Sequence, residues 1–222
     1  IYSDGPAGLV RVLAGGGPLE QVTRYDTTRK ETSHDYPEAL PNGRGVLFTI
    51  SAGSGAEIGV VDLRTGAHRS LVKGVYGRYA ASGHLVYVTA DGALLSAPFD
   101  PSRLQLTGPA TALAEGVNIR GGGYVDLALS RTGTLLYLGG AGGNTESDLV
   151  WVSRTGAAQV IDSGAFGTVA LSPDGRRVAV SILGGREEQL WVRSLPAGPL
   201  SKLTFEGTTN NRPTWTADGR AV

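Results

Sequence analysis

Short runs of apolar residues, separated by turns that contain glycine, repeat along the whole chain. Five similar pieces lead into a turn that closes on glycine: YPEALPNG (36–43), YGRYAASG (76–83), DLALSRTG (126–133), TVALSPDG (168–175) and RPTWTADG (212–219). Their closing glycines are separated by 40, 50, 42 and 44 residues. The runs are strand-length and rich in Val, Leu, Tyr and Trp, so there is no room for long helices. The pattern predicts an all-β chain of antiparallel hairpins.

The length of the repeat favours one architecture. Units of roughly 40–45 residues with four short strands each are typical of β-propeller blades. A β-sandwich predicts irregular spacing, and a β-helix predicts a repeat about half as long. We therefore expect a β-propeller of four-stranded antiparallel blades.

The two ends of the sequence complement each other. The last residues, GRAV (219–222), followed by the first residues, IYSD (1–4), align with GRGVLFTI (43–50). This predicts a five-bladed ring in which both termini complete one blade, which removes an exposed sheet edge. The single domain 1–222 would then have these approximate blades: 212–222 plus 1–33, 34–74, 75–117, 118–165 and 166–211. The competing interpretation is a trimmed part of a larger ring.

Composition excludes several functional classes. The 222 residues include 34 Gly and no Cys, with 20 basic and 20 acidic residues. An uncharged balance argues against a nucleic-acid or anionic-membrane partner, and no apolar run is long enough for membrane insertion of a helix. Without Cys there is no disulfide framework and no thiolate metal site. The chain begins at Ile1, without an initiator methionine, so we expect a processed piece of a larger multidomain protein.

Catalytic and cofactor motifs are scarce. The sequence has no GxSxG nucleophile elbow, and its Gly-rich segments do not open a helix as a phosphate site requires. The histidines stand at different positions of the repeat: His34 before an inner strand, His68 in an exposed turn and His84 at a strand start. This spacing predicts no metal site and no cofactor. The sequence thus favours a protein that is not an enzyme.

A binding site is expected where the inner strands begin. In a propeller these strands converge on the central channel, so the residues just before them can line one mouth. The position seven residues before each turn glycine holds Tyr36, Tyr76, Asp126, Thr168 and Arg212, with the neighbours His34, Asp35, Arg78 and Asn211. Aromatic rings, carboxylates and cations in one place suit a peptide, a glycan fragment or a small polar ligand. The alternative is that these groups only solvate a water-filled mouth.

Blade-level motifs carry a resemblance to a known family. LSPDGRRVAVSILGGREEQLWVRSL (171–195) and PTWTADGRAV (213–222) resemble the WD-repeat-like blades of TolB-type β-propellers. SHDYPEALPNGRGVLFTI (33–50) and GHLVYVTADGALLSAPFD (83–100) are similar to the propeller attached to some bacterial serine/threonine kinases. The resemblance implies a non-catalytic binding or sensory module, with a protein, peptide or small polar ligand as partner and an extracytoplasmic location.

Enzymatic alternatives stay open at this stage. One is a propeller hydrolase or lactonase that uses a divalent cation in the channel, for which Asp35, Asp126 and Asn211 are the available ligands. The other is the gating propeller of a prolyl-oligopeptidase-like peptidase, whose hydrolase domain this sequence does not contain.

Overall fold

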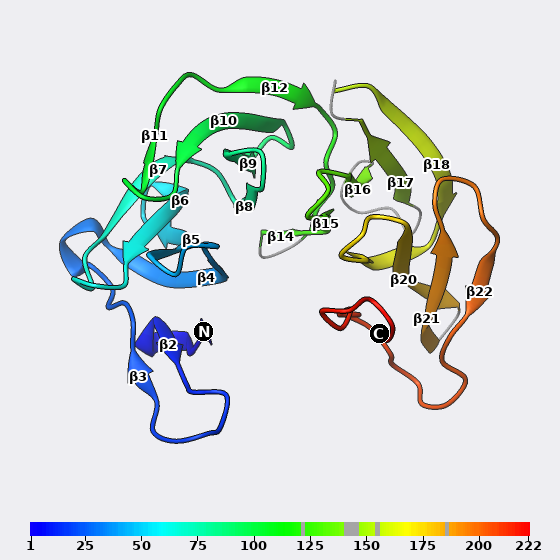
Figure 1. The fold of residues 1–222 in the computed structure, drawn as a ribbon, viewed down its shortest axis with the longest axis horizontal. Helices are drawn as coiled ribbons and strands as arrows, with labels where there is room; N and C mark the ends of the chain where they lie inside the picture. The colour runs from blue at the N-terminus through cyan, green and yellow to red at the C-terminus, as the bar shows by residue number, and fades with distance from the viewer. Residues whose placement is uncertain (121–122, 140–146, 154–155, 185–186) are drawn as a thin grey trace. The chain divides into compact units, whose positions relative to one another are not determined.

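The chain forms β-sheets joined by turns, with two short 3-10 helices. The computed structural model describes residues 1–120, 123–139, 147–153, 156–184 and 187–222 (Figure 1). It divides into two compact units, Ile1–Ala112 and Leu113–Val222, and each is described by itself. In the described part of the chain, no helix has the length and apolar character needed to cross a membrane.

The first unit contains three sheets that follow one another along the chain. The first is antiparallel and has the order β1 (Tyr2–Ser3), β2 (Leu9–Arg11) and β3 (Glu20–Gln21). The second is an antiparallel meander of β4 (Glu31–Ala39), β5 (Gly45–Ala52), β6 (Gly55–Asp62) and β7 (His68–Lys73). Helices η1 (Gly5–Ala7) and η2 (Thr27–Arg29) lie in the connections beside β1 and β4.

The third sheet of this unit repeats the meander. Its order is β8 (Tyr76–Ala80), β9 (His84–Val88), β10 (Leu94–Asp100) and β11 (Gln105–Leu106), and β12 (Thr111–Ala114) also pairs with β10. His84 begins β9, as the sequence predicts. A tight turn between Ala52 and Gly55 joins β5 to β6 in the second sheet.

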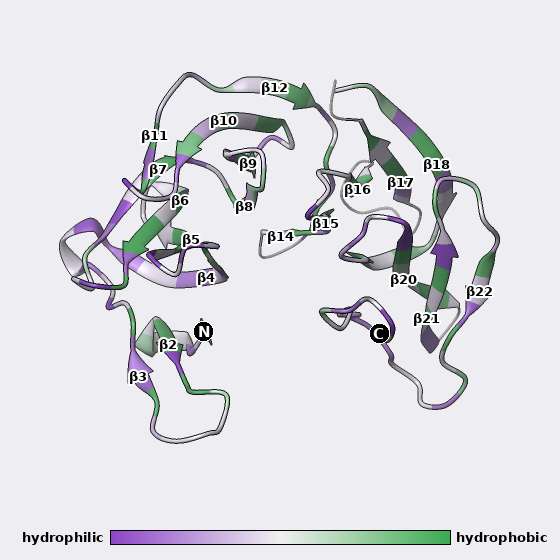
Figure 2. Cartoon of the chain, viewed as in Figure 1, coloured by the Kyte–Doolittle hydropathy of each residue, from purple (hydrophilic) through white to green (hydrophobic). Residues whose placement is uncertain are grey.

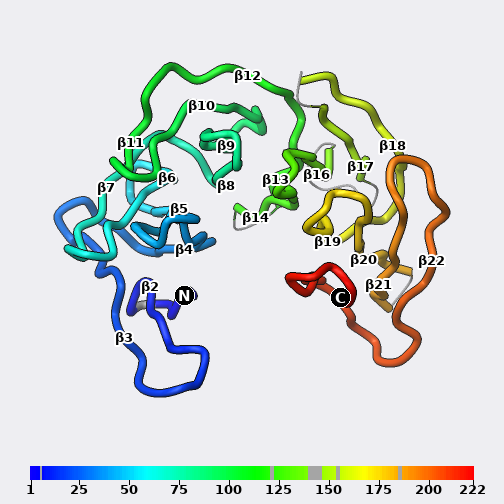
Figure 3. Tube along the Cα trace, in the orientation of Figure 1, coloured from blue at the N-terminus to red at the C-terminus, as the bar shows by residue number. Residues whose placement is uncertain are grey.

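The second unit contains one hairpin and two further meanders. The hairpin joins β13 (Ile119–Arg120) and β14 (Tyr124–Val125). The first meander runs through β15 (Leu127–Leu129), β16 (Leu135–Gly139), β17 (Ser147–Val152) and β18 (Ala158–Gly164). The second runs through β19 (Phe166–Leu171), β20 (Arg177–Gly184), β21 (Glu187–Ser194) and β22 (Leu200–Lys202). Successive strands within each sheet follow the chain order, which Figure 3 traces.

The predicted turn glycines have the backbone that the repeat requires. Gly43, Gly83, Gly133, Gly175 and Gly219 all have positive φ, between 65° and 87°. Glycine adopts this region without the steric cost that a Cβ imposes. The flanking side chains support the turn: the Asn42 Oδ1 accepts a hydrogen bond from the Arg44 backbone N–H at 2.9 Å. The predicted turn glycine is confirmed in all five repeats.

Apolar side chains pack between the faces of neighbouring sheets. Leu9 and Val22 of the N-terminal region pack with Val46, Phe48 and Ile50 of the second sheet. A separate cluster around Leu47, Leu85 and Phe99 joins the second and third sheets. In the second unit, Leu136, Leu149, Phe166, Val178 and Val180 form one cluster between the two meanders. Figure 2 shows apolar residues in strands such as β6 and β10.

The C-terminal segment differs from the prediction. The sequence places Trp215 in an inner strand, but residues 203–222 contain no strand. The turn itself forms, because the Thr216 N–H bonds the Ala221 carbonyl at 2.9 Å, matching the bond from Ser172 to Arg177 in the preceding repeat. A strand needs a partner to pair with, and only three residues follow Gly219. The segment instead lies beside β19, with the Trp215 indole N–H donating to the Ala170 carbonyl at 3.0 Å.

Candidate functional site

Equivalent positions of consecutive repeats lie together within each unit. In the first unit, the rings of Tyr36 and Tyr76 meet edge to face with centroids 5.3 Å apart. In the second unit, the Arg212 backbone N–H donates to the Thr168 Oγ1 at 3.0 Å. All four residues stand seven positions before a turn glycine. Equivalent positions of neighbouring repeats therefore bring polar and aromatic groups together in pairs within each unit.

Asp126, in the second unit, is a carboxylic acid with a strongly raised pKa. It stands between β14 and β15, and its carbonyl accepts the Leu138 N–H at 3.0 Å, which fixes it against β16. Its side chain is 12% exposed and forms an ion pair with Arg120 of β13. Burial raises the pKa of Asp126 to about 6, against the opposing effect of Arg120. The positive charge of Arg212 also lowers the pKa of Asp126, but less than that of Arg120.

Arg212 is held in an unusual backbone conformation. Its φ is 53°, in the left-handed region that residues with a Cβ seldom occupy. Tyr36 has the same φ, and each of these residues precedes a proline. Strained backbone of this kind persists where surrounding contacts hold it, and it is frequent at binding sites. The Arg212 guanidinium lies 6.0 Å from the ring centroid of Tyr124, a side chain that is exposed.

A chain of hydrogen bonds connects the backbone of Arg212 to the carboxylate of Glu188. The Thr168 hydroxyl accepts from the Arg212 N–H and lies 2.9 Å from the Ser181 Oγ. Ser181 in turn donates to the Glu188 Oε1 at 2.7 Å. The Asn211 amide donates to the other Glu188 oxygen at 2.9 Å. Glu188 thus anchors two neighbouring residues of the predicted site, Asn211 directly and Arg212 through two hydroxyls.

Glu188 is a residue that sequence reasoning missed. The charged segment around 186–188 reads as a solvated loop, but Glu187 and Glu188 begin β21, while Arg186 lies outside the described residues. Gly167 makes room for the Glu188 carboxylate, since a Cβ there would lie 2.5 Å from Glu188 Oε1 and 2.6 Å from Ser181 Oγ. A glycine directly before the predicted site residue Thr168 is the one signal in the sequence.

The first unit assembles a second, more aromatic group. The Arg78 guanidinium lies 4.8 Å from the ring centroid of Tyr76. On β4, the Glu38 Oε2 accepts the Tyr79 N–H at 2.8 Å, and burial raises the pKa of Glu38, opposed by the charge of Arg78. Tyr36, Tyr76 and Arg78 therefore lie together in the first unit. Cation–π contacts of this kind contribute about 0.5–2 kcal/mol, depending on solvation.

Asp35 and His34, two other predicted site residues, have different surroundings. Asp35 accepts a hydrogen bond from the Ser3 hydroxyl at 3.2 Å. His34 is fully buried, so it offers no surface to a solvent-filled mouth. Its side chain faces the opposite side of β4 from Asp35, as alternation along a strand requires.

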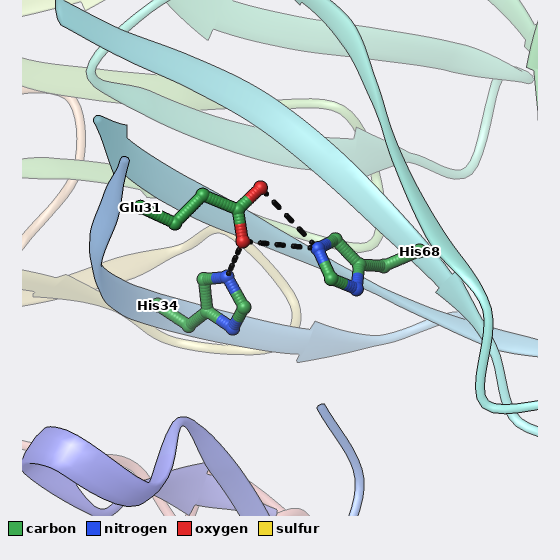
Figure 4. Close-up of side chains that lie close together, drawn as sticks. All are labelled: Glu31, His34 and His68. Atoms are coloured by element: carbon green, nitrogen blue, oxygen red, sulfur yellow. Dashed lines mark hydrogen bonds and ion pairs between the residues drawn. The ribbon is translucent and has the colours of Figure 1, made fainter. Parts of the chain in front are cut away.

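His34 and His68 converge on one carboxylate, whereas the sequence spacing predicts no metal site. His34 of β4 and His68 of β7 both contact the buried carboxylate of Glu31, and Figure 4 shows the three side chains pointing toward one another. His68 begins a strand and is 14% exposed, so the prediction of an exposed turn is wrong. Burial lowers the pKa of His34, although Glu31 opposes this shift. The pKa of Glu31 is lowered overall: burial raises it, but hydrogen bonds from the Asp26 N–H and the histidines outweigh that effect.

The groups around Arg212 include one buried hydroxyl and several exposed side chains. Ser181 is hydrogen-bonded to a carboxylate, but it is fully buried and cannot reach a substrate. The exposed members offer a ring at Tyr124 and a cation at Arg212, and Asp126 forms an ion pair with Arg120. These groups can recognise backbone amides, carboxylates and aromatic or apolar side chains.

Comparison with known proteins identifies the fold. The chain superposes on TolB from Acinetobacter baumannii with a TM-score of 0.62 at 18% identity, covering 82% of this chain and 44% of that one. A protein described as TolB from Agrobacterium tumefaciens gives a TM-score of 0.66 at 17% identity, covering 95% of this chain and 79% of that one. The chain has a TolB-like β-propeller fold. No family model and no curated protein matches the sequence.

The same propeller fold is also similar to parts of enzymes. A puromycin-hydrolyzing peptidase of Mycobacterium tuberculosis gives a TM-score of 0.53 at 14% identity, with 90% of this chain and 42% of that chain covered. At such identities the likeness concerns the fold alone, because propellers carry many unrelated functions. The chain spans less than half the length of the Acinetobacter TolB and of this peptidase.

Proposed function

We propose that this chain is a non-catalytic binding or sensory propeller module that holds a protein segment, peptide or small polar ligand where its inner strands begin. The observation that carries the proposal is the arrangement around Arg212. Its backbone is held in a strained conformation, its guanidinium lies near the exposed ring of Tyr124, and its positive charge acts on the carboxyl of Asp126, which is ion-paired with the exposed Arg120. Binding sites combine a few fixed polar groups with aromatic surface in this way.

The chemistry of the group favours a peptide. Arginine forms paired hydrogen bonds with carboxylates and carbonyls, and tyrosine offers apolar area with little loss of side-chain freedom on binding. Asp126 adds an acceptor for amide N–H groups when it is ionised. The aromatic group at Tyr36, Tyr76 and Arg78 offers similar chemistry on the first unit.

The finer architecture belongs to the same proposal. We place the five blades at 212–222 plus 1–33, 34–74, 75–117, 118–165 and 166–211, with both termini completing one blade. The spacing of the turn glycines and the alignment of GRAV followed by IYSD with GRGVLFTI support this arrangement. A closed ring would bring the starts of all inner strands to one channel mouth.

Selection from a randomised peptide library on the immobilised chain tests the binding function. We expect selected peptides to bind the wild-type chain and to lose about tenfold or more in affinity on Arg212→Ala or Asp126→Asn, the range of a typical hot spot. Arg220→Ala is the matched control, because that side chain is exposed and, among the described residues, its one ion pair is with Asp218, Nε to Oδ2 at 4.0 Å. Equal affinity of all these variants, or hydrolysis of the selected peptide, would contradict the proposal.

A further inference from the structure

We propose that Glu31, His34 and His68 form a binding site for a single zinc-class transition-metal ion. The site lies within the first unit, where the N-terminal sheet packs on the second sheet, and it is separate from the peptide-binding groups proposed above. Two imidazoles and one carboxylate are a ligand set that zinc uses in proteins, leaving a fourth position for water.

The distances between the ligand atoms suit a tetrahedral centre. With metal–ligand bonds of roughly 2.0–2.2 Å, two ligands of a tetrahedral zinc ion stand about 3.3 Å apart. The Glu31 Oε2 lies 3.0 Å from the His34 Nε2 and 3.1 Å from the His68 Nε2. One ligand atom from each residue falls within 4.8 Å of the others. Only the separation between the two histidines has to shorten for an ion to contact all three.

A β-bulge in β4 makes this convergence possible. Residues three apart on a regular strand point to opposite faces. The register between β4 and β5 shifts between Glu31 and Ser33, which adds one residue and turns Glu31 and His34 to the same face. His68 reaches them from the beginning of β7. Without the bulge, Glu31 and His34 would lie on opposite faces of β4, so the shared site depends on it.

The second ring nitrogen of His34 is held as in metal sites. Its Nδ1 lies 2.7 Å from the Thr23 Oγ1, and Thr23 is itself fixed by a hydrogen bond from the Leu9 N–H at 2.9 Å. Metal-binding histidines characteristically engage such a partner, which fixes the ring and its tautomer. The rings of Tyr25 and Phe48 enclose His34 with centroids 4.9 and 4.8 Å away. The ligand is therefore preorganised.

The exposure of the ligands and the charges around them determine how an ion enters the site and which ion binds. His68 is partly exposed while Glu31 and His34 are buried, so an ion enters along His68. Nitrogen-rich ligands favour zinc-class ions over calcium or magnesium, which prefer oxygen. The Arg29 guanidinium opposes any cation: its Nη1 lies 3.9 Å from the Glu31 Oε1, although its Nη2 is engaged by Glu57 at 2.6 Å.

Calorimetric titration of the untagged, chelator-treated chain with Zn²⁺ tests the site. We expect one equivalent bound at micromolar concentration, and Co²⁺ should give the intense visible bands of a tetrahedral centre. His68→Ala should weaken Zn²⁺ binding by about tenfold or more. His84→Ala is the control, since His84 lies in another sheet and its ring bonds only Ser82 among the residues described. No binding by the wild-type chain, or equal binding by His68→Ala, would overturn the proposal.

Arg29→Gln gives an independent test that does not remove a ligand. Loss of the nearby positive charge should strengthen Zn²⁺ binding severalfold, whereas a purely structural network of histidines and glutamate gives no such response. This variant also keeps the test decisive if a ligand variant fails to fold. Unchanged or weaker Zn²⁺ affinity in Arg29→Gln would count against an ion at Glu31.

Discussion

At the scale of single residues, the proposed binding role rests on residues with a left-handed backbone or a raised pKa. Tyr36 and Arg212 share a left-handed backbone at equivalent positions of the repeat. Asp126 is buried beside two arginines and keeps a raised pKa in spite of them. Such combinations of strain and burial cost stability and are more frequent at functional sites than elsewhere.

The raised pKa of Asp126 predicts a pH effect on stability. The folded chain keeps this proton up to about pH 6, whereas an unfolded aspartate has a pKa of 3.8. Between these values the folded state binds more protons than the unfolded state. The free energy of unfolding should therefore fall as pH rises through this window, by at most about 3 kcal/mol.

Urea unfolding of the wild-type chain and of Asp126→Asn between pH 4 and 7 measures this effect, and the difference between them removes the titration of other groups. We expect the wild type to lose stability relative to the variant as pH rises to about 6. A difference that does not change with pH would show that Asp126 titrates normally.

At the scale of elements, close contacts between neighbouring strands position the site. Gly167 of β19 lets Glu188 of β21 reach Ser181 of β20. Gly167→Ala should cost about 1–3 kcal/mol, because the new Cβ overlaps both side chains and has to displace them. Gly184→Ala on β20 is the matched control, since nothing lies within 4 Å of its Cβ position. Equal melting temperatures for the two variants would contradict this packing.

The turns allow a second comparison. Gly175 and Gly83 occupy the same place in their repeats with φ of 71° and 82°. A Cβ at Gly175 would lie 2.9 Å from the Thr134 Oγ1 and 3.0 Å from the Ser130 Oγ. A Cβ at Gly83 would have no described atom within 4 Å. Both alanine variants should lose about 1 kcal/mol for the backbone, and Gly175→Ala should lose more. A larger loss for Gly83→Ala, measured by chemical denaturation, would be inconsistent with the contacts between the two meanders.

The strands and turns were predictable from the sequence because their signals are local. Alternating apolar residues and turn glycines fix hairpins without knowledge of distant residues. Glu31 and Glu188 were not predictable, since their roles depend on a bulge in β4 and on the space above Gly167. The predicted strand at Trp215 is absent because strand formation depends on a pairing partner and not only on the residue pattern.

At the scale of the whole molecule, the account predicts that the two termini share one blade. The chain has no cysteine, so spin labels can be placed at Ser3→Cys and Arg220→Cys without first removing native cysteines. In a continuous strand the residues between them span roughly 15 Å, so the distance between labels should be narrow and below about 25 Å. A broad or much longer distribution would exclude closure by the termini.

Hydrogen–deuterium exchange of the chain with and without a selected peptide tests the central claim most directly. The account predicts that the peptide slows exchange in residues 123–126, 166–171 and 208–213, the three segments that hold Asp126, Thr168 and Arg212. Slower exchange confined to outer strands such as β7 or β12, with no change in these three segments, would contradict it.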